Sequence, residues 1–464
     1  MELQKKFLKD AEKVAFDPEH RRKLNHNISK YQVNVEKGKK QFNDLELARK
    51  KAANTRHKIL NDLDKYLIEF ESNFEKNGGK VIWASTAKDA VKEIMAIMKN
   101  AKAVSVVKSK SMMTEELELN EILEKKKIEA IETDLGEFIV QLAGEKPYHI
   151  LTPAMHKSKE DVAKLYHEKF GMPLDSTPAA IAAYTRNYLR EKFLSAGVGI
   201  TGANFLLSDL GAVCLTENEG NGLMSMSFPK VHIVIAGIEK ILPSISDLQL
   251  FWPLLATMGT GQKVTAYNSI VFGPRHEDEA DGPAEMYVVL LDNRRTEVLK
   301  QERARRALSC IRCGACLNAC PVYKNIGGYT YSSVYTGPIG SVITPWMEDM
   351  GEYRHLSYAS SLCGNCTDVC PVHIPLHELL LVNREKSVEM GYAKGGEKFV
   401  MNNMKRVLLS RKMMNMRGGF KNMLFRRFFA SAWGPRRELP RLEAKTFNKL
   451  WREKQERLEK EVER

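Results

Sequence analysis

Hydrophobic residues in the first part of the chain recur at helical spacing. Residues 1–75 are rich in charge, and within 5–15 and 43–73 apolar side chains return every three or four positions, as on one face of a helix. The stripe over 43–73 consists of Leu45, Leu47, Ile59, Leu63, Tyr66, Leu67 and Phe70. The pattern predicts an N-terminal helical segment over residues 1–75, a helical hairpin that packs its apolar stripe on the domain that follows.

At Gly79 the pattern changes to short apolar runs separated by amphipathic stretches. The strand-like runs are residues 80–84, 103–107, 128–132, 149–152, 213–216, 231–237, 264–267 and 286–291, and the helical stretches are 87–99, 114–127, 159–170 and 178–194. Strands separated by helices of about 10 to 15 residues predict βαβ units and a mainly parallel sheet. We therefore expect one α/β domain over residues 76–298.

Ligands of parallel sheets bind in the loops that follow the carboxyl ends of the strands. Three loops qualify here. Residues 108–114 are basic and rich in hydroxyls, which suits an anion at a helix N-terminus, residues 197–204 are rich in glycine, and residues 216–222 are densely polar. A tight turn with capping residues explains each loop equally well. The sequence of these loops matches neither a dinucleotide-binding motif nor a P-loop.

Seven of the eight cysteines lie within the 61 residues from 310 to 370. In a reducing compartment such clustering indicates metal ligation, because thiols there do not persist as disulfides. The first run is Cys310, Cys313, Cys316 and Cys320, followed by a proline. This is C-x2-C-x2-C-x3-C-P, the spacing of bacterial two-cluster ferredoxins, in which the fourth cysteine serves the other cluster.

The second run repeats the first without its first cysteine, whose position is held by Ser360. Crossed ligation assigns Cys310, Cys313, Cys316 and Cys370 to cluster one, and Cys320, Cys363 and Cys366 to cluster two. Three outcomes fit the fourth corner of cluster two. It is a three-iron cluster, a four-iron cluster with Ser360 or water as a weak ligand, or a four-iron cluster with one iron open to substrate.

Zinc is the alternative metal, because pairs of C-x2-C also suit a tetrahedral zinc ion. Zinc leaves the two C-x3-C-P ends and their near repeat unexplained, so iron–sulfur clusters are favoured. The eighth cysteine, Cys214, lies in an apolar strand-like run and is predicted to be a buried core thiol. His373 and His377 are expected on a polar helix face rather than as metal ligands.

Helical sequence surrounds the cysteines. Residues 301–309, 342–358 and 374–390 have helical patterns, and the stretch between the two cysteine runs is far longer than the spacer of a small ferredoxin. We therefore expect a two-cluster, α-helical ferredoxin module over residues 299–390, similar to the iron–sulfur subunits of succinate dehydrogenase-type complexes.

The net charge of +13 lies almost entirely in a tail over residues 391–464, which has 20 basic and 8 acidic residues. Its apolar residues include Met401, Met404, Met413, Met414, Met416, Met423, Phe420, Phe425, Phe428, Phe429 and Trp433, interleaved with Lys and Arg such as Arg417. A basic helical tail of this kind suits a cover over the chain's own domains, a groove on a partner protein, or an anionic membrane surface. No nucleic-acid partner is expected, because nothing else in the chain reads bases.

The composition, with 43% hydrophobic and 28% charged residues, is that of a globular protein and excludes wholesale disorder. No apolar run approaches the roughly 18 residues that span a bilayer, and the first residues lack the apolar core of a signal peptide. We expect a cytoplasmic protein, peripheral at most to the inner face of the membrane.

Several segments, together with both cysteine runs, resemble the lactate utilization protein B family, the iron–sulfur members of a bacterial three-protein L-lactate utilization system. The segments are residues 132–142, 199–203, 218–222 and 230–233. The resemblance covers essentially the whole chain. It implies an α/β domain similar in fold to sugar-phosphate isomerases and CoA transferases, two four-iron clusters on the seven cysteines, other lactate-utilization subunits as partners, and electron transfer in the oxidation of L-lactate to pyruvate. It assigns no catalytic residue, and the missing eighth cysteine looks like a trait of the family.

Three functions follow from these patterns. In the first, the clusters accept electrons from a lactate-oxidising partner and pass them towards a membrane acceptor. In the second, the chain itself binds lactate, with Lys108 or Lys110 holding the carboxylate near the open corner by Ser360. The lack of a flavin or nicotinamide motif disfavours this, because hydride removal from a 2-hydroxy acid normally uses such a cofactor. In the third, the chain is a scaffold whose α/β domain senses a small anion.

Overall fold

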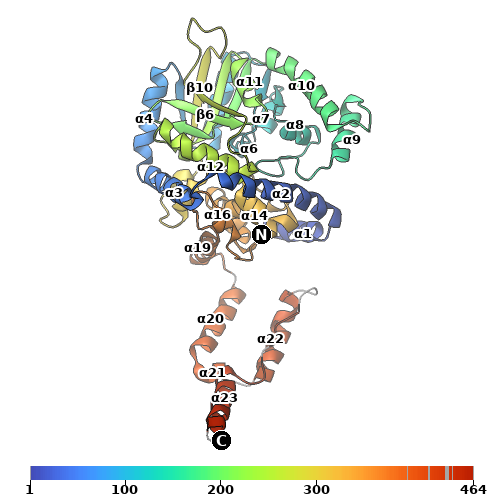
Figure 1. Cartoon of the computed structure of the whole chain (residues 1–464), viewed down its shortest axis with the longest axis vertical. Coiled ribbons are helices and arrows are strands. Elements are labelled where there is room, and N and C mark those ends of the chain that lie inside the picture. The colour runs from blue at the N-terminus through green and yellow to red at the C-terminus, as the bar shows by residue number, and fades with distance from the viewer. Residues whose placement is uncertain (1, 394, 416–417, 434–437, 442, 463–464) are drawn as a thin grey trace. The chain divides into compact units, whose positions relative to one another are not determined.

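The computed structural model describes residues 2–393, 395–415, 418–433, 438–441 and 443–462. The chain divides into two compact units, Met1–Ser387 and Val388–Arg464. The first unit contains an α/β part and all eight cysteines, and its polypeptide begins with a set of long helices (Figure 1).

A six-stranded sheet forms the centre of the first unit. Its strand order is β1 (Lys80–Ala84), β10 (Glu285–Leu291), β7 (Val231–Gly237), β4 (Val198–Gly202), β2 (Ser105–Lys108) and β3 (Glu129–Glu132). Every neighbouring pair in this sheet is parallel, which confirms the expected parallel α/β fold. Parallel neighbours need crossover connections, and the helices between the strands supply them.

Side chains of the central strands alternate between two buried faces, as strand geometry requires. On β7, Ile233 and Ile235 face the helices α5 (Ala87–Asn100), α6 (Met112–Glu116) and α7 (Leu119–Lys125), whereas Val234 and Ala236 face the other way. At the β2–β3 end, a third core contains residues of α8 (Leu135–Leu142), α9 (Lys159–Phe170) and α10 (Pro178–Ser195).

A second, four-stranded sheet covers the other face. Its order is β8 (Ile241–Leu242), β5 (Phe205–Leu207), β6 (Ala212–Glu217) and β9 (Tyr267–Val271). The expectation that residues 213–216 and 264–267 join the parallel sheet is therefore wrong. Only residues 208–211 link β5 to β6, too few for a crossover, so the two strands pair antiparallel. Cys214 on β6 is a buried core thiol, as predicted, and burial raises its pKa to about 12.

The glycine-rich stretch 197–204, expected as a loop, contains the fully buried central strand β4. Its glycines serve packing instead of turning. A Cβ atom on Gly199 would lie 1.8 Å from the carbonyl oxygen of Ser225 on α11 (Asn221–Ser227). Only glycine lets this helix approach the strand so closely.

Two other elements differ from expectation. Residues 149–152 form no strand, because the His149 imidazole accepts the Leu151 amide at 3.1 Å and Lys110 donates to the Leu151 carbonyl at 2.9 Å. The amide and the carbonyl of Leu151 are therefore not available for hydrogen bonds to a neighbouring strand. The helix expected over 114–127 is divided into α6 and α7 at Glu118, which has φ +50°.

The cysteine-bearing module is helical, as expected, but its helices are short. They are α13 (Arg295–Leu299), η4 (Ala304–Ser309), α14 (Ala315–Ala319), α15 (Pro321–Ile326), η5 (Tyr329–Tyr331), α16 (Gly337–Met347), α17 (Met350–Tyr353), η6 (Arg354–Tyr358), α18 (Asn365–Asp368) and α19 (Leu376–Glu389). The elements labelled η are 3₁₀ helices. Of the helical stretch expected over 301–309, the structure forms the 3₁₀ helix Ala304–Ser309. Irregular segments that carry cysteines separate several of these helices.

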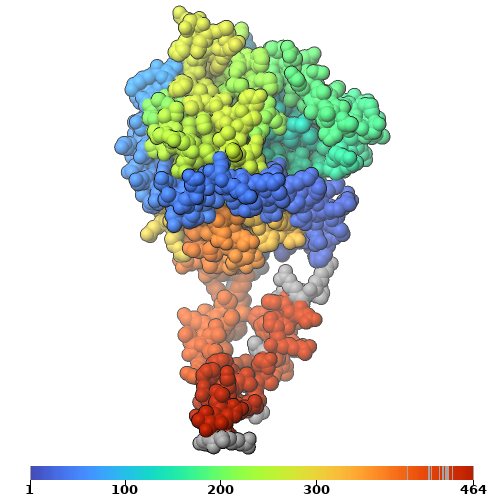
Figure 2. Space-filling view, viewed as in Figure 1, coloured from blue at the N-terminus to red at the C-terminus, as the bar shows by residue number. Residues whose placement is uncertain are grey.

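The N-terminal segment is more than the expected hairpin. It comprises α1 (Glu2–Ala15), α2 (Pro18–Gly38), the 3₁₀ turn η1 (Lys39–Gln41), α3 (Leu45–Asn61) and α4 (Leu63–Lys76). Helix α2 packs on both α12 (Leu248–Thr260) of the α/β part and α15 of the module, and α3 packs on η4. Figure 2 shows these blue helices as a band across the boundary between the α/β part and the orange module.

The second unit contains the helices α20 (Gly395–Leu409), α21 (Arg411–Met414), α22 (Gly418–Trp433) and α23 (Phe447–Val462). Several of its large apolar side chains are exposed, among them Phe399, Met401 and Leu409. Met416 and Arg417 lie outside the described residues, as do the side chains of Phe420 and Phe428. Among the helices that the structure describes, none has the length and apolar character needed to cross a membrane.

The close approach at Gly199 gives a stability prediction. Gly199→Ala should lower the free energy of unfolding by about 3 kcal/mol, because the added methyl group overlaps a backbone oxygen. Gly197→Ala is the matched control, since its Cβ would lie 3.6 Å from Ala103 in ordinary contact. Urea unfolding followed by circular dichroism under anaerobic conditions compares the two. Equal stability of the two variants would contradict this account of β4.

Candidate metal centre

The seven clustered cysteines surround two small cavities in the helical module. Cys310, Cys313, Cys316 and Cys370 line the first cavity, and Cys320, Cys363 and Cys366 line the second. Each cysteine run therefore contributes its last member, the cysteine before a proline, to the other run's cavity. The structure thus brings together the two sets that crossed ligation requires.

The local chain geometry of the two runs is the same. Gly314 and Gly364 each follow a cysteine, have φ of +73° and +85°, and precede the short helices α14 and α18. This left-handed conformation favours glycine and turns the chain sharply, so that cysteines on both sides of the turn face one cavity. At Gly314 space is also short, because a Cβ atom would lie 3.2 Å from Ile150 and Leu151.

The first cavity has apolar walls. They include Ile150, Ile311, Leu317, Ile339, Val372, Ile374 and Leu376. Backbone amides point at the sulfurs, with 3.4 Å from the Arg312 nitrogen to Cys310 Sγ and 3.3 Å from the Ile374 nitrogen to Cys370 Sγ. Such N–H···S bonds stabilise negative charge on thiolate ligands and help to set the potential of a bound cluster.

The buried thiols in these cavities do not readily lose their protons. Burial raises the pKa of both Cys366 and Cys370 to about 11, and it also raises the pKa of Cys313 and Cys316. At neutral pH they lose their protons only to a bound metal.

The spread of the donors distinguishes a cluster from a single ion. Within the described ranges, no three Cys, His, Asp or Glu side chains are placed to hold one metal ion. A tetrahedral zinc ion needs its ligands about 2.3 Å from a common point, whereas an iron–sulfur cube spreads its thiolates over separate corners. The two crossed sets of cysteines, each lining its own cavity, fit two iron–sulfur clusters.

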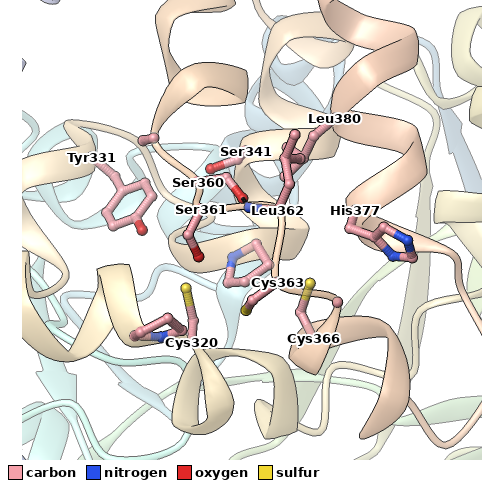
Figure 3. A pocket seen from close by; sticks show the side chains of 14 residues that line it. Cys320, Tyr331, Ser341, Ser360, Ser361, Leu362, Cys363, Cys366, His377 and Leu380 are labelled. Carbon is pink, nitrogen blue, oxygen red and sulfur yellow. Dashed lines mark hydrogen bonds between the residues drawn. The ribbon is translucent and has the colours of Figure 1, made fainter. Parts of the chain in front are cut away.

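Figure 3 shows the lining of the second cavity. Cys363 is exposed. The Ser360 hydroxyl, expected near the vacant ligand position, accepts the backbone N–H of Leu362 at 3.0 Å. The neighbouring Ser361 hydroxyl points toward the cysteine sulfurs in Figure 3 and makes no hydrogen bond in the described part of the chain. Spacing identified Ser360 and missed Ser361, because it counts positions and not side-chain directions.

Both histidines near the second run are held by polar neighbours. His377 Nδ1 lies 2.7 Å from the Thr367 hydroxyl, and His373 Nε2 lies 3.3 Å from the Glu46 carboxylate. The His377 ring is turned away from the sulfurs in Figure 3. His377 lies on α19, as expected, whereas His373 precedes this helix, so its placement on a helix face is wrong.

A buried network of charged side chains adjoins the first cavity. Arg295 is fully buried, with 2.7 Å from its Nε to Glu239 Oε2 and 2.8 Å from its Nη2 to Glu116 Oε2. Arg312, from the first cysteine loop, lies 3.5 Å from Glu239 and 4.3 Å over the Tyr335 ring. Burial alone would raise the pKa of Glu239, but Arg295, Arg312 and Lys240 lower it to about 2.

Two further cations complete this network. Arg56 from α3 is 1% exposed and donates to the carbonyl oxygens of Ile241, Glu239 and Leu308. Lys240 is 7% exposed, and its ammonium group makes no hydrogen bond or ion pair among the described residues. Burial, followed by repulsion from Arg312, lowers the pKa of Lys240 to about 8. No local sequence pattern reveals this network, because its charged members come from five separate segments.

The lysines considered for a substrate carboxylate are already engaged within the chain. The Lys108 ammonium is fully buried and lies 2.6 Å from both Glu132 and Asn120. The Lys110 ammonium donates to the Leu151 carbonyl and lies 3.6 Å from Asp134. Because both ammonium groups have partners within the chain, the structure does not favour either lysine as the group that holds a carboxylate.

The polar loop 216–222 acts as a helix cap. The Glu217 carboxylate accepts the amides of Gly222 at 2.7 Å and Leu223 at 2.8 Å, at the start of α11. Glu219 accepts the amide of Leu135 at 3.1 Å, at the start of α8. Of the two interpretations of this loop, capping accounts for these carboxylates.

The central ion pairs give a second stability prediction. Arg295→Met should cost about 3–5 kcal/mol of unfolding free energy, because it leaves Glu116 and Glu239 buried without their shared cation. Lys80→Met is the control, since Lys80 pairs with Glu285 at 2.7 Å but is half exposed, and such surface pairs contribute at most about 1 kcal/mol. Denaturant unfolding of the two variants measures both effects. An equally small loss in both would show that the network contributes little.

Comparison with known proteins places these features in a family. The LUD domain model matches residues 67–291, and the 4Fe-4S dicluster domain model matches residues 306–374. "Lactate utilization protein B" of Bacillus cereus (strain AH820) is 44% identical over 347 residues, which is 75% of this chain and 73% of the relative. "Lactate utilization protein B 2" of Bacillus mycoides (strain KBAB4) matches with the same identity and coverage.

Among solved structures, a DUF162 family protein from Deinococcus radiodurans matches with 14% identity and a TM-score of 0.27, over 49% of this chain and 98% of that chain. The identity and coverage of the Bacillus relatives, together with the two domain matches, show that the chain belongs to the lactate utilization protein B family.

Proposed function

We propose that this chain is an iron–sulfur electron-transfer protein that takes part in the oxidation of L-lactate to pyruvate. The observation that carries the proposal is the pair of cysteine-lined cavities within one module, each built by both cysteine runs. Paired clusters conduct electrons and make no bonds in the substrate. The names of the relatives, each a lactate utilization protein B, support lactate as the source of these electrons.

In this proposal each cavity holds one cluster, and both clusters are [4Fe–4S]. Cys310, Cys313, Cys316 and Cys370 hold the first, and Cys320, Cys363 and Cys366 hold three corners of the second. Each cluster, when bound, carries one electron at a time. Oxidation of L-lactate to pyruvate releases two electrons and two protons, so the two clusters together take up the electrons of one substrate molecule while the protons leave with the oxidising partner.

The surroundings of the two cavities suggest different roles. The walls of the first cavity are mainly apolar, whereas the exposed Cys363 brings the second cluster close to the surface. Electron exchange with a partner needs a short path to the surface, which favours the second cluster as the point of exchange.

The Ser361 hydroxyl is the better candidate for the fourth corner of the second cluster. It faces the sulfurs and has no hydrogen bond in the described part of the chain, whereas the Ser360 hydroxyl is bound to the Leu362 amide. A serine or water ligand is weaker than a thiolate, so this corner loses iron most readily and yields a [3Fe–4S] cluster.

The alternative, in which this chain itself binds and oxidises lactate, is less well supported. It required Lys108 or Lys110 to hold the substrate carboxylate, and both ammonium groups are bound to the chain's own oxygens. The proposed function therefore includes other lactate-utilization subunits, one of which binds the substrate. The exposed apolar residues of the basic second unit support contact with those subunits or with the inner face of the membrane.

Lactate-dependent reduction tests this function. L-Lactate should bleach the visible absorbance of the clusters when the other lactate-utilization proteins are present, because they supply the oxidising step. The purified chain alone should stay oxidised with lactate, although dithionite reduces it. Rapid reduction of the chain alone by L-lactate, with pyruvate formed, would support the alternative.

The assignment of the fourth corner gives a separate prediction. Ser361→Ala should increase the oxidised three-iron EPR signal of anaerobically purified protein, because the open corner loses its oxygen ligand. Ser360→Ala is the matched control and should leave this signal at the level of the unchanged protein. An increase in the Ser360 variant alone would assign the corner to Ser360 instead.

A further inference from the structure

We infer that Arg56, Lys240 and Arg312 form a built-in counter-charge for the first cluster and raise its reduction potential above that of the same cluster without them. The inference rests on the proposed function, because it requires a cluster held by Cys310, Cys313, Cys316 and Cys370. It concerns residues outside the cysteine motifs.

The buried network contains more positive than negative charge. Four cations, Arg56, Lys240, Arg295 and Arg312, share two carboxylates, Glu116 and Glu239. Arg295 binds both carboxylates directly, which leaves the other three cations with only a share of Glu239. The two carboxylates therefore do not neutralise the four cations, and the network keeps an excess of positive charge.

Unpaired atoms mark where that charge is missing. Arg56 Nε and Arg312 Nη1 are buried without hydrogen-bond partners, and the Lys240 ammonium makes no hydrogen bond or ion pair among the described residues. An isolated buried cation is strongly destabilising unless an anion lies close by. This cost indicates that a buried anion belongs beside these three groups.

The first cysteine loop lies against this network. Arg312 lines the first cavity together with Cys310, and Arg56 donates to the carbonyl oxygen of Leu308, two residues before Cys310. Lys240 directly follows Glu239, which lies 3.5 Å from Arg312. Arg312 also belongs to the same loop, and its backbone nitrogen lies 3.4 Å from Cys310 Sγ. A four-iron cluster on four thiolates is an anion in both of its redox states, so the cluster completes the network.

Reduction makes the cluster more negative by one charge, which nearby cations stabilise. In a buried, poorly screened site this effect is much larger than at the surface. Near the second cavity, the cation Lys324 follows Cys320 by four positions, is partly exposed and is therefore more strongly screened by water. The cations thus favour an electron on the first cluster, away from the exposed Cys363.

The test is a redox titration of the full-length, cluster-loaded protein, followed by EPR. Lys240→Met should lower the midpoint potential of one cluster and leave the other unchanged. Arg56→Gln should lower the potential of the same cluster. Lys240→Arg should keep the potential of the unchanged protein, because it retains the charge, and this separates charge from packing.

Arg305→Gln is the matched control. Like Arg56, Arg305 donates to a backbone carbonyl, that of Leu60 at 3.0 Å, and leaves its Nε unpaired. Its loss should change neither potential. Unchanged potentials in both Lys240→Met and Arg56→Gln, with both clusters bound, would overturn the inference.

Lys240→Gln replaces the Met variant if that variant does not fold. If the unsubstituted protein binds no iron, the proposed function is wrong. If it binds both clusters but the variants leave the potentials unchanged, only this inference is wrong.

Discussion

The buried charge network around Arg295 is the interaction on which the rest of the first unit depends. It ties α6 and the turn after β7 to α13, and through Arg312 it reaches the first cysteine loop. Arg56 extends the same network to the N-terminal helices. A buried charge without an ion-pair partner is strongly destabilising. None of these segments can therefore move away without leaving a charged side chain unpaired or exposed. The α/β part and the cysteine module are consequently parts of one compact unit.

In our proposal, the α/β part supports the first cluster while a partner subunit binds the substrate. Carboxyl ends of parallel strands commonly form ligand sites. Here the segments after β7 and β10 contribute Glu239, Lys240 and Arg295 to the charge network, which reaches the first cysteine loop through Arg312. At the end of β2, Lys108 is paired with Glu132. In this account the sheet supports and electrostatically tunes the clusters.

The features that sequence predicted correctly are those encoded locally. Cysteine spacing repeats over a few residues, and strands alternating with helices indicate a parallel sheet without knowledge of distant contacts. The features that sequence missed depend on tertiary packing. The glycines of β4 resemble a loop until α11 is placed against them, and the direction of the Ser361 hydroxyl depends on how the second cysteine loop closes. The charge network joins residues as distant as Arg56 and Arg312, and no short motif encodes it.

The central claim is that seven cysteines hold two iron–sulfur clusters within this unit. Iron and acid-labile sulfide analysis of anaerobically purified protein, combined with EPR before and after dithionite, tests it most directly. The account predicts about eight irons per chain, and reduced signals broadened by the interaction of two nearby clusters. Stoichiometric zinc in place of iron, or a single isolated cluster signal, would contradict it.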